Sequence, residues 1–216
     1  MDAYSKNSLK EVMEIYFSIK EEIKRKLAEF KVKKDQNKIF AELVFCILTP
    51  QSNAKSCWRA VENLISKNLL LNGNKSQIVK ELNGVRFKYK KAEYIIKARE
   101  KFSINGELFI ISKINQFKDV YKIRDWLVEN IKGLSYKEAS HFLRNIGLGE
   151  NFAILDRHIL KNLKLLGIIN EIPRSLSKKR YYEIEEKMKK FSEKINIPLE
   201  ELDFVLWYKE KGEIFK

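Results

Sequence analysis

Apolar residues recur every three or four positions through the first part of the chain. The series runs Leu9, Val12, Met13, Tyr16, Ile19, Ile23 and Leu27. This spacing places the side chains on one face of a helix, and Asn7 or Ser8 is available to cap its start. Only 8 Gly and 3 Pro occur in 216 residues, and stretches of alternating polar and apolar residues are nearly absent. Helix is therefore the structure predicted for most of the chain.

The same criteria predict further helices separated by short turns. They span residues 38–48, 54–66, 75–82, 90–102, 119–131, 136–145, 158–166, 178–195 and 198–209. Only Leu108–Ile111 resembles a strand. We therefore expect an all-α protein with two helical lobes and a cleft. Residues 1–34 with 122–216 are expected to form one lobe and residues 35–121 the other, intertwined in one compact body.

The chain carries a formal net charge of +14, with 43 Lys and Arg against 29 Asp and Glu. This excess favours a nucleic-acid partner, because neutralising phosphates releases counterions. Abundant Lys and Glu is also typical of proteins from hot environments, but that adaptation raises both signs together. No apolar run is long enough to cross a bilayer, and no secretory signal is present at the N-terminus. Cys46 and Cys57 are expected to be small buried side chains in a reducing cytoplasm.

The segment Leu127–Ala139 places a glycine turn between two predicted helices. Gly133 permits a tight turn and a close approach of the backbone, so successive N–H groups and the dipole of the second helix can bind a DNA phosphate. This is the helix-hairpin-helix pattern. Ser135 stands where a second glycine is usual, although serine can cap the following helix. The alternative is an ordinary helix-loop-helix that binds nothing.

Lys137 begins the second helix of this hairpin, beside any phosphate that the turn binds. A lysine amine is a nucleophile only when it is deprotonated, which burial, a nearby positive charge or a helix N-terminus promotes. The alternative is that Lys137 is one of many solvated surface lysines. Asp156 directly precedes an apolar-periodic helix. It is predicted to cap that helix or to act as the carboxylate partner of Lys137, and the two roles are compatible.

The segment Gly133–Lys137, followed by Asp156, resembles the helix-hairpin-helix DNA glycosylase superfamily. The whole chain is similar to the compact 8-oxoguanine DNA glycosylase/AP lyases typical of archaea and some thermophilic bacteria. Within the superfamily, this closer similarity to the compact subgroup rests on Leu48–Asn53, His158, Trp207 and the terminal Lys216. The chain lacks the C-terminal cysteines that hold an iron–sulfur cluster in endonuclease III.

The resemblance implies a glycosylase in which Lys137 attacks C1′ of a nucleotide turned out of the duplex. Asp156 would stabilise positive charge on the sugar and help to manage the proton of the amine. The resulting Schiff base allows β-elimination, which nicks the strand 3′ to the lesion. Neither a metal nor an organic cofactor is implied. The implied partner is double-stranded DNA containing 8-oxoguanine, bound by a monomer in the cytoplasm at the nucleoid, with no membrane involved.

The resemblance also implies DNA contacts outside the hairpin. Gln51 matches a plug that fills the space of the extruded base. Phe87 matches a wedge between base steps, and Arg86 is placed to reach the opposite base or a phosphate. The residues alone leave three other roles open: Gln51 as a helix cap, Phe87 as a core aromatic and Arg86 as a solvated cation. His158 is expected to contact a phosphate or to be a structural histidine.

Trp207 and Lys216 are the residues that the resemblance implies in recognition of the base. At N7, 8-oxoguanine carries a donor where guanine has an acceptor, so a carboxylate or carbonyl acceptor placed there would select the lesion. The C-terminal carboxylate is one candidate, and the Lys216 side chain, acting elsewhere on the base, is the other. Trp207 offers a stacking face and equally fits a core stripe with Phe204. Two other functions stay open: the same fold acting on an oxidised pyrimidine or a mispaired adenine, and a non-catalytic helix-hairpin-helix module that only binds DNA.

Overall fold

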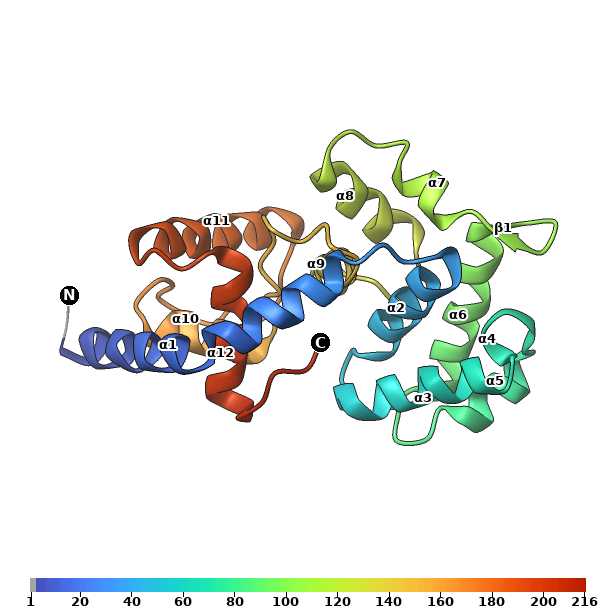
Figure 1. Ribbon diagram of the computed structural model, residues 1–216, viewed down its shortest axis with the longest axis horizontal. Coiled ribbons are helices and arrows are strands. Elements are labelled where there is room, and N and C mark those ends of the chain that lie inside the picture. The colour runs from blue at the N-terminus through green and yellow to red at the C-terminus, as the bar shows by residue number, and fades with distance from the viewer. Residues whose placement is uncertain (1–2) are drawn as a thin grey trace. The chain divides into compact units, whose positions relative to one another are not determined.

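The computed structural model describes residues 3–216, with side chains from Lys6 onward. Within this range it contains twelve helices and one two-stranded hairpin (Figure 1), which confirms the predicted all-α class. The chain divides into two compact units. The terminal unit comprises the residues up to Val32 together with Gly147–Lys216, and the central unit comprises Lys33–Ile146.

The terminal unit is built from four helices. These are α1 (Ala3–Lys31), α10 (Arg157–Leu165), α11 (Lys178–Lys194) and α12 (Leu199–Lys211). Helix α12 packs against the other three, and most of its residues from Leu199 to Leu206 are buried. The predicted apolar face of α1 is buried as well, with Val12 and Ile23 fully shielded from solvent. Apolar burial of this kind is the main source of stability in the unit.

Helix α1 begins at Ala3, before the caps predicted at Asn7 or Ser8. The prediction of a cap there is wrong, because residues 3–8 contain no glycine or proline that would stop the helix. Ser8 is instead a buried residue within the first turns of α1. A serine in the interior of a helix does not mark its start unless the chain leaves the helical conformation at that point.

The central unit holds the remaining elements. They are α2 (Gln36–Leu48), α3 (Ala54–Ser66), α4 (Leu69–Asn72), α5 (Lys75–Glu81), α6 (Lys88–Phe102), β1 (Ser103–Ile104), β2 (Glu107–Leu108), α7 (Ile110–Ile114), α8 (Val120–Asn130) and α9 (Tyr136–Asn145). Helix α2 contacts α3, α6, α7 and α9, and every residue from Ile39 to Leu48 is buried. Such a helix is apolar on most sides and has to be surrounded.

Both cysteines lie in the central unit as free, buried side chains, as the sequence predicts. Burial raises the pKa of the Cys57 thiol to about 11 and raises the pKa of Cys46 well above its ordinary value. Thiols in this state are unreactive, because the thiolate is the nucleophilic form. The two cysteines therefore act as packing residues.

The predicted helices after α1 agree with the structure to within two residues at each end, and α3 and α9 match at both ends. The short helices α4 and α7 and the hairpin β1–β2 were not predicted. Leu108–Ile111, the stretch that most resembled a strand, is divided between β2 and α7. A turn at Asn105 and Gly106, both with positive φ, pairs Ser103 with Leu108.

The division into units differs from the predicted lobes at residues 122–146. These residues were expected with the terminal lobe, and in the structure they belong to the central unit. The physical reason is packing: α8 contacts α9, and α9 contacts the buried helix α2. The hairpin that carries Lys137 is therefore built on the central core.

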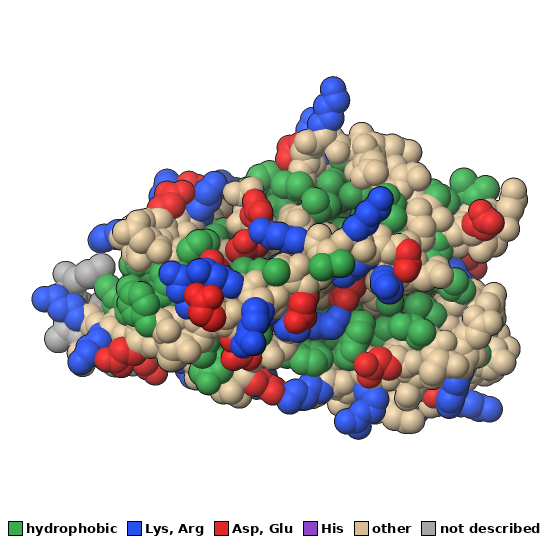
Figure 2. Space-filling model, in the orientation of Figure 1, with side chains coloured by type: hydrophobic (Ala, Val, Ile, Leu, Met, Phe, Trp, Pro, Cys, Tyr) green, Lys and Arg blue, Asp and Glu red, His purple; other side chains and the backbone are tan. Residues whose placement is uncertain are grey.

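The surface is strongly charged, as the composition requires. On the face drawn in Figure 2, Lys and Arg side chains are interspersed with Asp and Glu. Several charged side chains of the described residues form exposed pairs, such as Lys97 with Glu93, which contribute little to stability. Among residues 3–216, no helix combines the length and the apolar character that a bilayer-spanning segment needs.

One buried hydrogen bond links the first and last helices of the terminal unit. The Tyr16 hydroxyl on α1 donates to Glu201 Oε2 on α12 at 2.9 Å, and both residues are buried. We expect Tyr16→Phe to lower the free energy of unfolding by about 1–3 kcal/mol, because the buried carboxylate loses a donor. Urea titration followed by circular dichroism measures the change. Tyr89→Phe, which removes an exposed hydroxyl, is the control, and an equal effect of both variants would contradict the prediction.

Candidate active site and nucleic-acid interface

Helices α8 and α9 form a helical hairpin whose two arms are joined by polar contacts. The fully buried Arg124 guanidinium on α8 donates from Nη1 to Ser140 Oγ on α9 at 3.0 Å. The Tyr136 hydroxyl donates to Asp125 Oδ1 at 2.9 Å, and the Tyr136 ring lies 5.6 Å from the Arg124 guanidinium. These contacts fix the start of α9 relative to α8, so the turn between them has little freedom.

Gly133 occupies this turn in a conformation that other residues avoid. Its φ is +91°, which L side chains rarely adopt. A Cβ at this position would also lie 2.6 Å from Cδ2 of Tyr94, which packs against the turn from α6. Glycine is therefore required for the backbone conformation and for the close packing of the hairpin on α6.

Ser135 caps α9, as predicted. Its backbone N–H donates to Glu138 Oε2 at 3.1 Å, and its hydroxyl contacts the same carboxylate. The N–H of Ser135 is thus paired inside the hairpin. A phosphate at this turn would have to compete with Glu138 for that N–H.

Lys137 lies in the first turn of α9, with 22% of its side chain exposed. Its Nζ is 3.7 Å from Glu138 Oε1. The side chain is neither freely solvated nor sealed inside the protein. This position keeps the amine within reach of a ligand at the hairpin and places it beside the positive end of a helix dipole.

Gln51 and Phe87 lie on two loops of the central unit, and both have left-handed backbone conformations, with φ of +56° and +58°. Phe87 precedes α6 and is 57% exposed, so the alternative of a core aromatic is wrong. Gln51 is exposed and does not cap α3, because Asn53 does so by accepting from Ser56 N. Arg86 is exposed, and its guanidinium lies 5.4 Å from the Phe87 ring.

Asp156 caps α10 in the terminal unit, as predicted. Its Oδ1 accepts from the backbone N–H groups of His158 at 2.8 Å and Ile159 at 2.9 Å. Both capping bonds use the same oxygen. Oδ2 makes no hydrogen bond with any described residue, and the side chain is partly exposed. The geometry therefore allows one carboxylate to cap the helix and to face a ligand.

The backbone that leads into Asp156 is held by buried side chains of α11 and α12. Ala153 N donates to Glu185 Oε1 and Ile154 N to Asp203 Oδ1, both at 3.0 Å. The Tyr181 hydroxyl accepts from Leu155 N at 3.3 Å and donates to the carbonyl of Ala153 at 2.6 Å. Buried backbone groups need such partners. This non-helical segment is consequently fixed in position, and Asp156 with it.

His158 and Trp207 pack edge to face in the terminal unit, with ring centroids 5.6 Å apart. His158 Nδ1 is 3.5 Å from Glu210 Oε2, which also pairs with Lys161 at 3.0 Å. Burial opposes ionisation of Glu210, but the hydrogen bonds from Lys161 and Asn162 outweigh it and lower its pKa. His158 thus has the partners of a structural histidine, and contact with a phosphate stays a prediction.

Trp207 and Lys216 lie in the last part of the chain. Trp207 Nε1 is buried and finds no hydrogen-bond partner among the described residues, while the residue as a whole is partly exposed. Helix α12 ends at Lys211 and is capped by Gly212, which has a φ of +69°. Lys216, in the segment that follows, is partly buried. The roles of both residues in base recognition stay predictions.

The structure brings the predicted residues together in three groups. One is the hairpin with Gly133, Ser135 and Lys137, the second is the pair of loops with Gln51, Arg86 and Phe87, and the third is the N-terminus of α10 with Asp156, His158 and Trp207. The first two groups belong to the central unit and the third to the terminal unit.

Several supporting residues escaped the sequence analysis. Lys91 lies on the buried face of α6 with Ile95, and Glu185 lies on the buried face of α11 with Met188. A charged residue at an apolar position of a helical repeat is the signal that could have indicated them. Asp203 in the apolar stretch of α12 carries the same signal.

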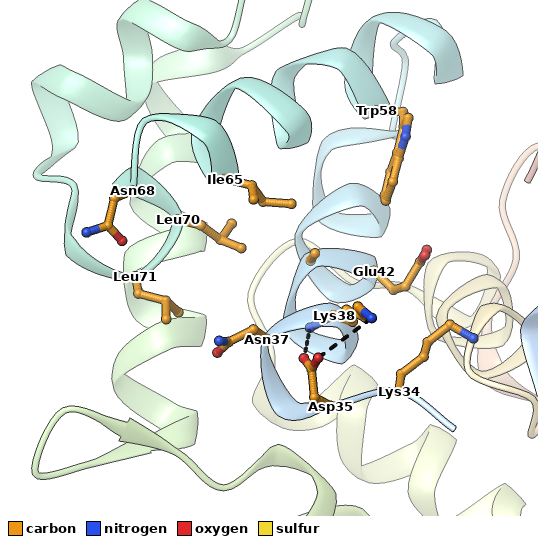
Figure 3. Close-up of a pocket in the computed structure, with 11 residues that line it drawn as sticks. Lys34, Asp35, Asn37, Lys38, Glu42, Trp58, Ile65, Asn68, Leu70 and Leu71 are labelled. Carbon is orange, nitrogen blue, oxygen red and sulfur yellow. Dashed lines mark hydrogen bonds and ion pairs between the residues drawn. The ribbon is translucent and has the colours of Figure 1, made fainter. Parts of the chain in front are cut away.

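A pocket of about 530 Å³ lies in the central unit (Figure 3). Its lining combines apolar residues such as Leu70 and Ile65 with polar ones. Asp35 in this lining caps α2 by accepting from Lys38 N at 2.8 Å and lies 3.9 Å from Lys38 Nζ. None of the predicted site residues lines the pocket, so it is not the place of the predicted chemistry.

A model of the 8-oxoguanine DNA glycosylase family matches residues 23–197 of the chain. The chain is 50% identical over 209 residues to an 8-oxoguanine DNA glycosylase/AP lyase of Fusobacterium nucleatum, covering 95% of this chain and 96% of that protein. It is also similar to the crystal structure of the 8-oxoguanine DNA glycosylase of Methanocaldococcus jannaschii, with a TM-score of 0.87, 35% identity and complete coverage of both chains.

A second similar structure is the Methanocaldococcus jannaschii 8-oxoguanine glycosylase/lyase in complex with a 15mer DNA containing 8-oxoguanine. Its TM-score is 0.86 and its identity 37%, and the match covers 96% of this chain and 98% of that chain. The similarity therefore extends over the whole length of the chain and is not confined to the hairpin.

We expect Gly133→Ala to lower the free energy of unfolding by about 1–3 kcal/mol, because the new side chain meets an unfavourable φ and the Tyr94 ring. Gly106→Ala is a matched control, since Gly106 has a φ of +84° but a Cβ added there would meet no atom within 4 Å. Urea titration of both variants separates the backbone penalty from the clash. Equal destabilisation would show that close packing at Gly133 contributes nothing.

Proposed function

We propose that this chain, which belongs to the 8-oxoguanine DNA glycosylase family, excises 8-oxoguanine from double-stranded DNA and then cleaves the strand as an AP lyase. The observation that carries the proposal is the match over nearly the full length to proteins named 8-oxoguanine DNA glycosylase/AP lyase. The match favours this activity over an oxidised pyrimidine or mispaired adenine as substrate, and over a module that only binds DNA.

Lys137 is the proposed nucleophile. The damaged nucleotide leaves the base stack, because C1′ cannot be reached inside a duplex. The unprotonated amine attacks C1′, the bond from C1′ to N9 breaks, and its electron pair leaves with the base, which takes up a proton. The attached nitrogen gives up one proton, its lone pair then breaks the C1′–O4′ bond, and the ring oxygen takes up a proton as it leaves, which gives a protonated Schiff base. This acidifies the C2′ proton, whose removal expels the 3′ phosphate by β-elimination.

Asp156 is the proposed supporting carboxylate. Its negative charge stabilises the positive charge that develops on the sugar as the base departs, and it can accept a proton from the attacking amine. Two features support this role: both capping bonds fall on Oδ1, and the segment before Asp156 is held by buried side chains. A carboxylate fixed in this way needs little rearrangement when the sugar arrives.

The DNA contacts follow the roles that the family resemblance implies, and the exposure of Gln51, Arg86 and Phe87 supports them. The turn at Gly133 would bind a phosphate through backbone N–H groups. Gln51 would fill the space of the extruded base, and the exposed Phe87 would insert between base steps, which offsets part of the unstacking cost of a few kcal/mol. Arg86, beside the Phe87 ring, would pair with the opposite base or a phosphate.

Trp207 and Lys216 are the proposed base-recognition residues. The Trp207 ring would stack on the base, and its Nε1–H remains available as a donor. A hydrogen-bond acceptor at N7 would pair with the donor of 8-oxoguanine and face the lone pair of guanine, and we assign Lys216 to this selection. We also propose that the protein acts as a monomer on the DNA of a prokaryotic cytoplasm.

Borohydride trapping tests the nucleophile. We expect the parent protein to give a covalent adduct with 8-oxoguanine duplex, because borohydride reduces the Schiff base, and we expect Lys137→Gln to give none. Denaturing gel electrophoresis detects the adduct. Lys187→Gln, an exposed lysine on α11, controls for the loss of one positive charge. An adduct that persists in Lys137→Gln would identify another amine as the nucleophile.

For Asp156→Asn we expect single-turnover base release to slow at least about tenfold, a loss of about 1.4 kcal/mol of transition-state stabilisation. Asparagine caps helices about as well as aspartate, so the free energy of unfolding should change little. Rapid-quench kinetics and urea titration measure the two quantities. An unchanged rate would leave Asp156 with a capping role alone.

A further inference from the structure

Lys91 is a buried lysine on the apolar face of α6. Only 4% of the residue is exposed, although lysine is almost never fully buried without partners. Its Nζ donates to the carbonyls of Leu48 and Pro50, both at 2.7 Å, and to Ser52 Oγ at 3.0 Å. An ammonium group has three donors and no acceptor. The three acceptors belong to the last residue of α2 and to the turn that follows it, which carries Gln51.

Ser52 extends this contact to a second loop. Its hydroxyl accepts from Arg86 N at 3.0 Å and is 3.4 Å from the carbonyl of Pro50, to which it donates. One hydroxyl therefore connects the turn at Gln51 with the backbone beside Phe87. Lys91 and Ser52 together form a tether between the two loops.

The tether lies next to the two strained positions of these loops. Gln51 and Phe87 both have positive φ, which is unfavourable for residues with a Cβ and persists only when the surrounding structure enforces it. Both side chains are exposed. In the terms of the proposed function, these are the plug and the wedge, and the tether joins the two loops that carry them.

Burial lowers the pKa of Lys91, and the nearby charges of Arg86 and Lys137 act in the same direction, while Cys57 and Glu138 act against it. A methionine would match the apolar face of α6 without this unfavourable desolvation. It would, however, leave the carbonyl of Leu48 with only the weak thiol donor of Cys57 at 3.2 Å, and the carbonyl of Pro50 with only the Ser52 hydroxyl at 3.4 Å. The Lys91 ammonium thus stabilises the turn through its hydrogen bonds and does not improve the packing of α6.

We infer that Lys91 is a positioning residue for duplex opening: it fixes the Gln51 turn directly and the Phe87 loop through Ser52, so that plug and wedge enter the DNA without a further loss of conformational freedom. This inference rests on the proposed function. Pre-ordered loops lower the entropic cost of binding. Their benefit applies only where base pairs have to be opened, because an unpaired lesion needs neither a plug nor a wedge.

The test compares two substrates. One is a fully paired duplex with 8-oxoguanine, and the other carries the same lesion strand with the lesion inside a bubble of unpaired bases. We expect Lys91→Met to slow single-turnover base release from the paired duplex at least about tenfold and release from the bubble less than about threefold. Lys97→Met is the matched control on α6, since Lys97 is exposed and pairs with Glu93, and it should change neither rate more than about twofold.

Ser52→Ala provides a second variant that removes only the shared hydroxyl. We expect the same selectivity with a smaller loss, about threefold on the paired duplex and none on the bubble. If circular dichroism shows that Lys91→Met does not fold, Ser52→Ala decides the question. Equal losses on both substrates, or no loss on the paired duplex, would overturn the inference. A parent protein that releases no base from either substrate would instead contradict the proposed function.

Discussion

The position of Asp156 depends on three buried side chains that pair an otherwise unpaired stretch of backbone. Glu185, Asp203 and Tyr181 hydrogen-bond the backbone of residues 153–155. Without these partners, burying that segment would leave amide groups desolvated, at a cost of about 1–3 kcal/mol for each. The hydrogen bonds that avoid this cost hold α11 and α12 against the segment that precedes α10. They also fix the Asp156 carboxylate at the N-terminus of α10, with one oxygen left for a ligand.

The central unit has the same kind of contact at the two loops that we propose to bind DNA. A side chain from a helix pairs backbone groups of a turn, as Lys91 does for Leu48 and Pro50, and the turn then holds an exposed residue in a strained conformation. The hairpin adds a third example, in which Glu138 pairs the N–H of Ser135. Rigid placement of polar groups before the substrate arrives is what electrostatic catalysis requires.

The sequence predicted the helices well because their apolar periodicity is local. It also identified Lys137 and Asp156 as candidates, through a glycine turn and a resemblance to a family. It did not predict α4 or α7, which are too short for a periodic signal. It placed residues 122–146 with the terminal lobe, whereas they pack within the central unit, because the packing of α9 on α2 leaves no pattern in the chain. Contacts such as that of Lys91 with Pro50 join residues 41 positions apart. The sequence indicates such contacts only through a charged residue, such as Lys91, at an apolar position of a helical repeat.

The central claim is that one particular amine forms the covalent link to the sugar. The most direct measurement is to digest the borohydride-reduced protein–DNA complex with protease and nuclease and to locate the remaining sugar adduct by tandem mass spectrometry. We expect the adduct on the Nζ of Lys137, at the start of α9. An adduct on a different lysine or on the N-terminal amine would contradict it.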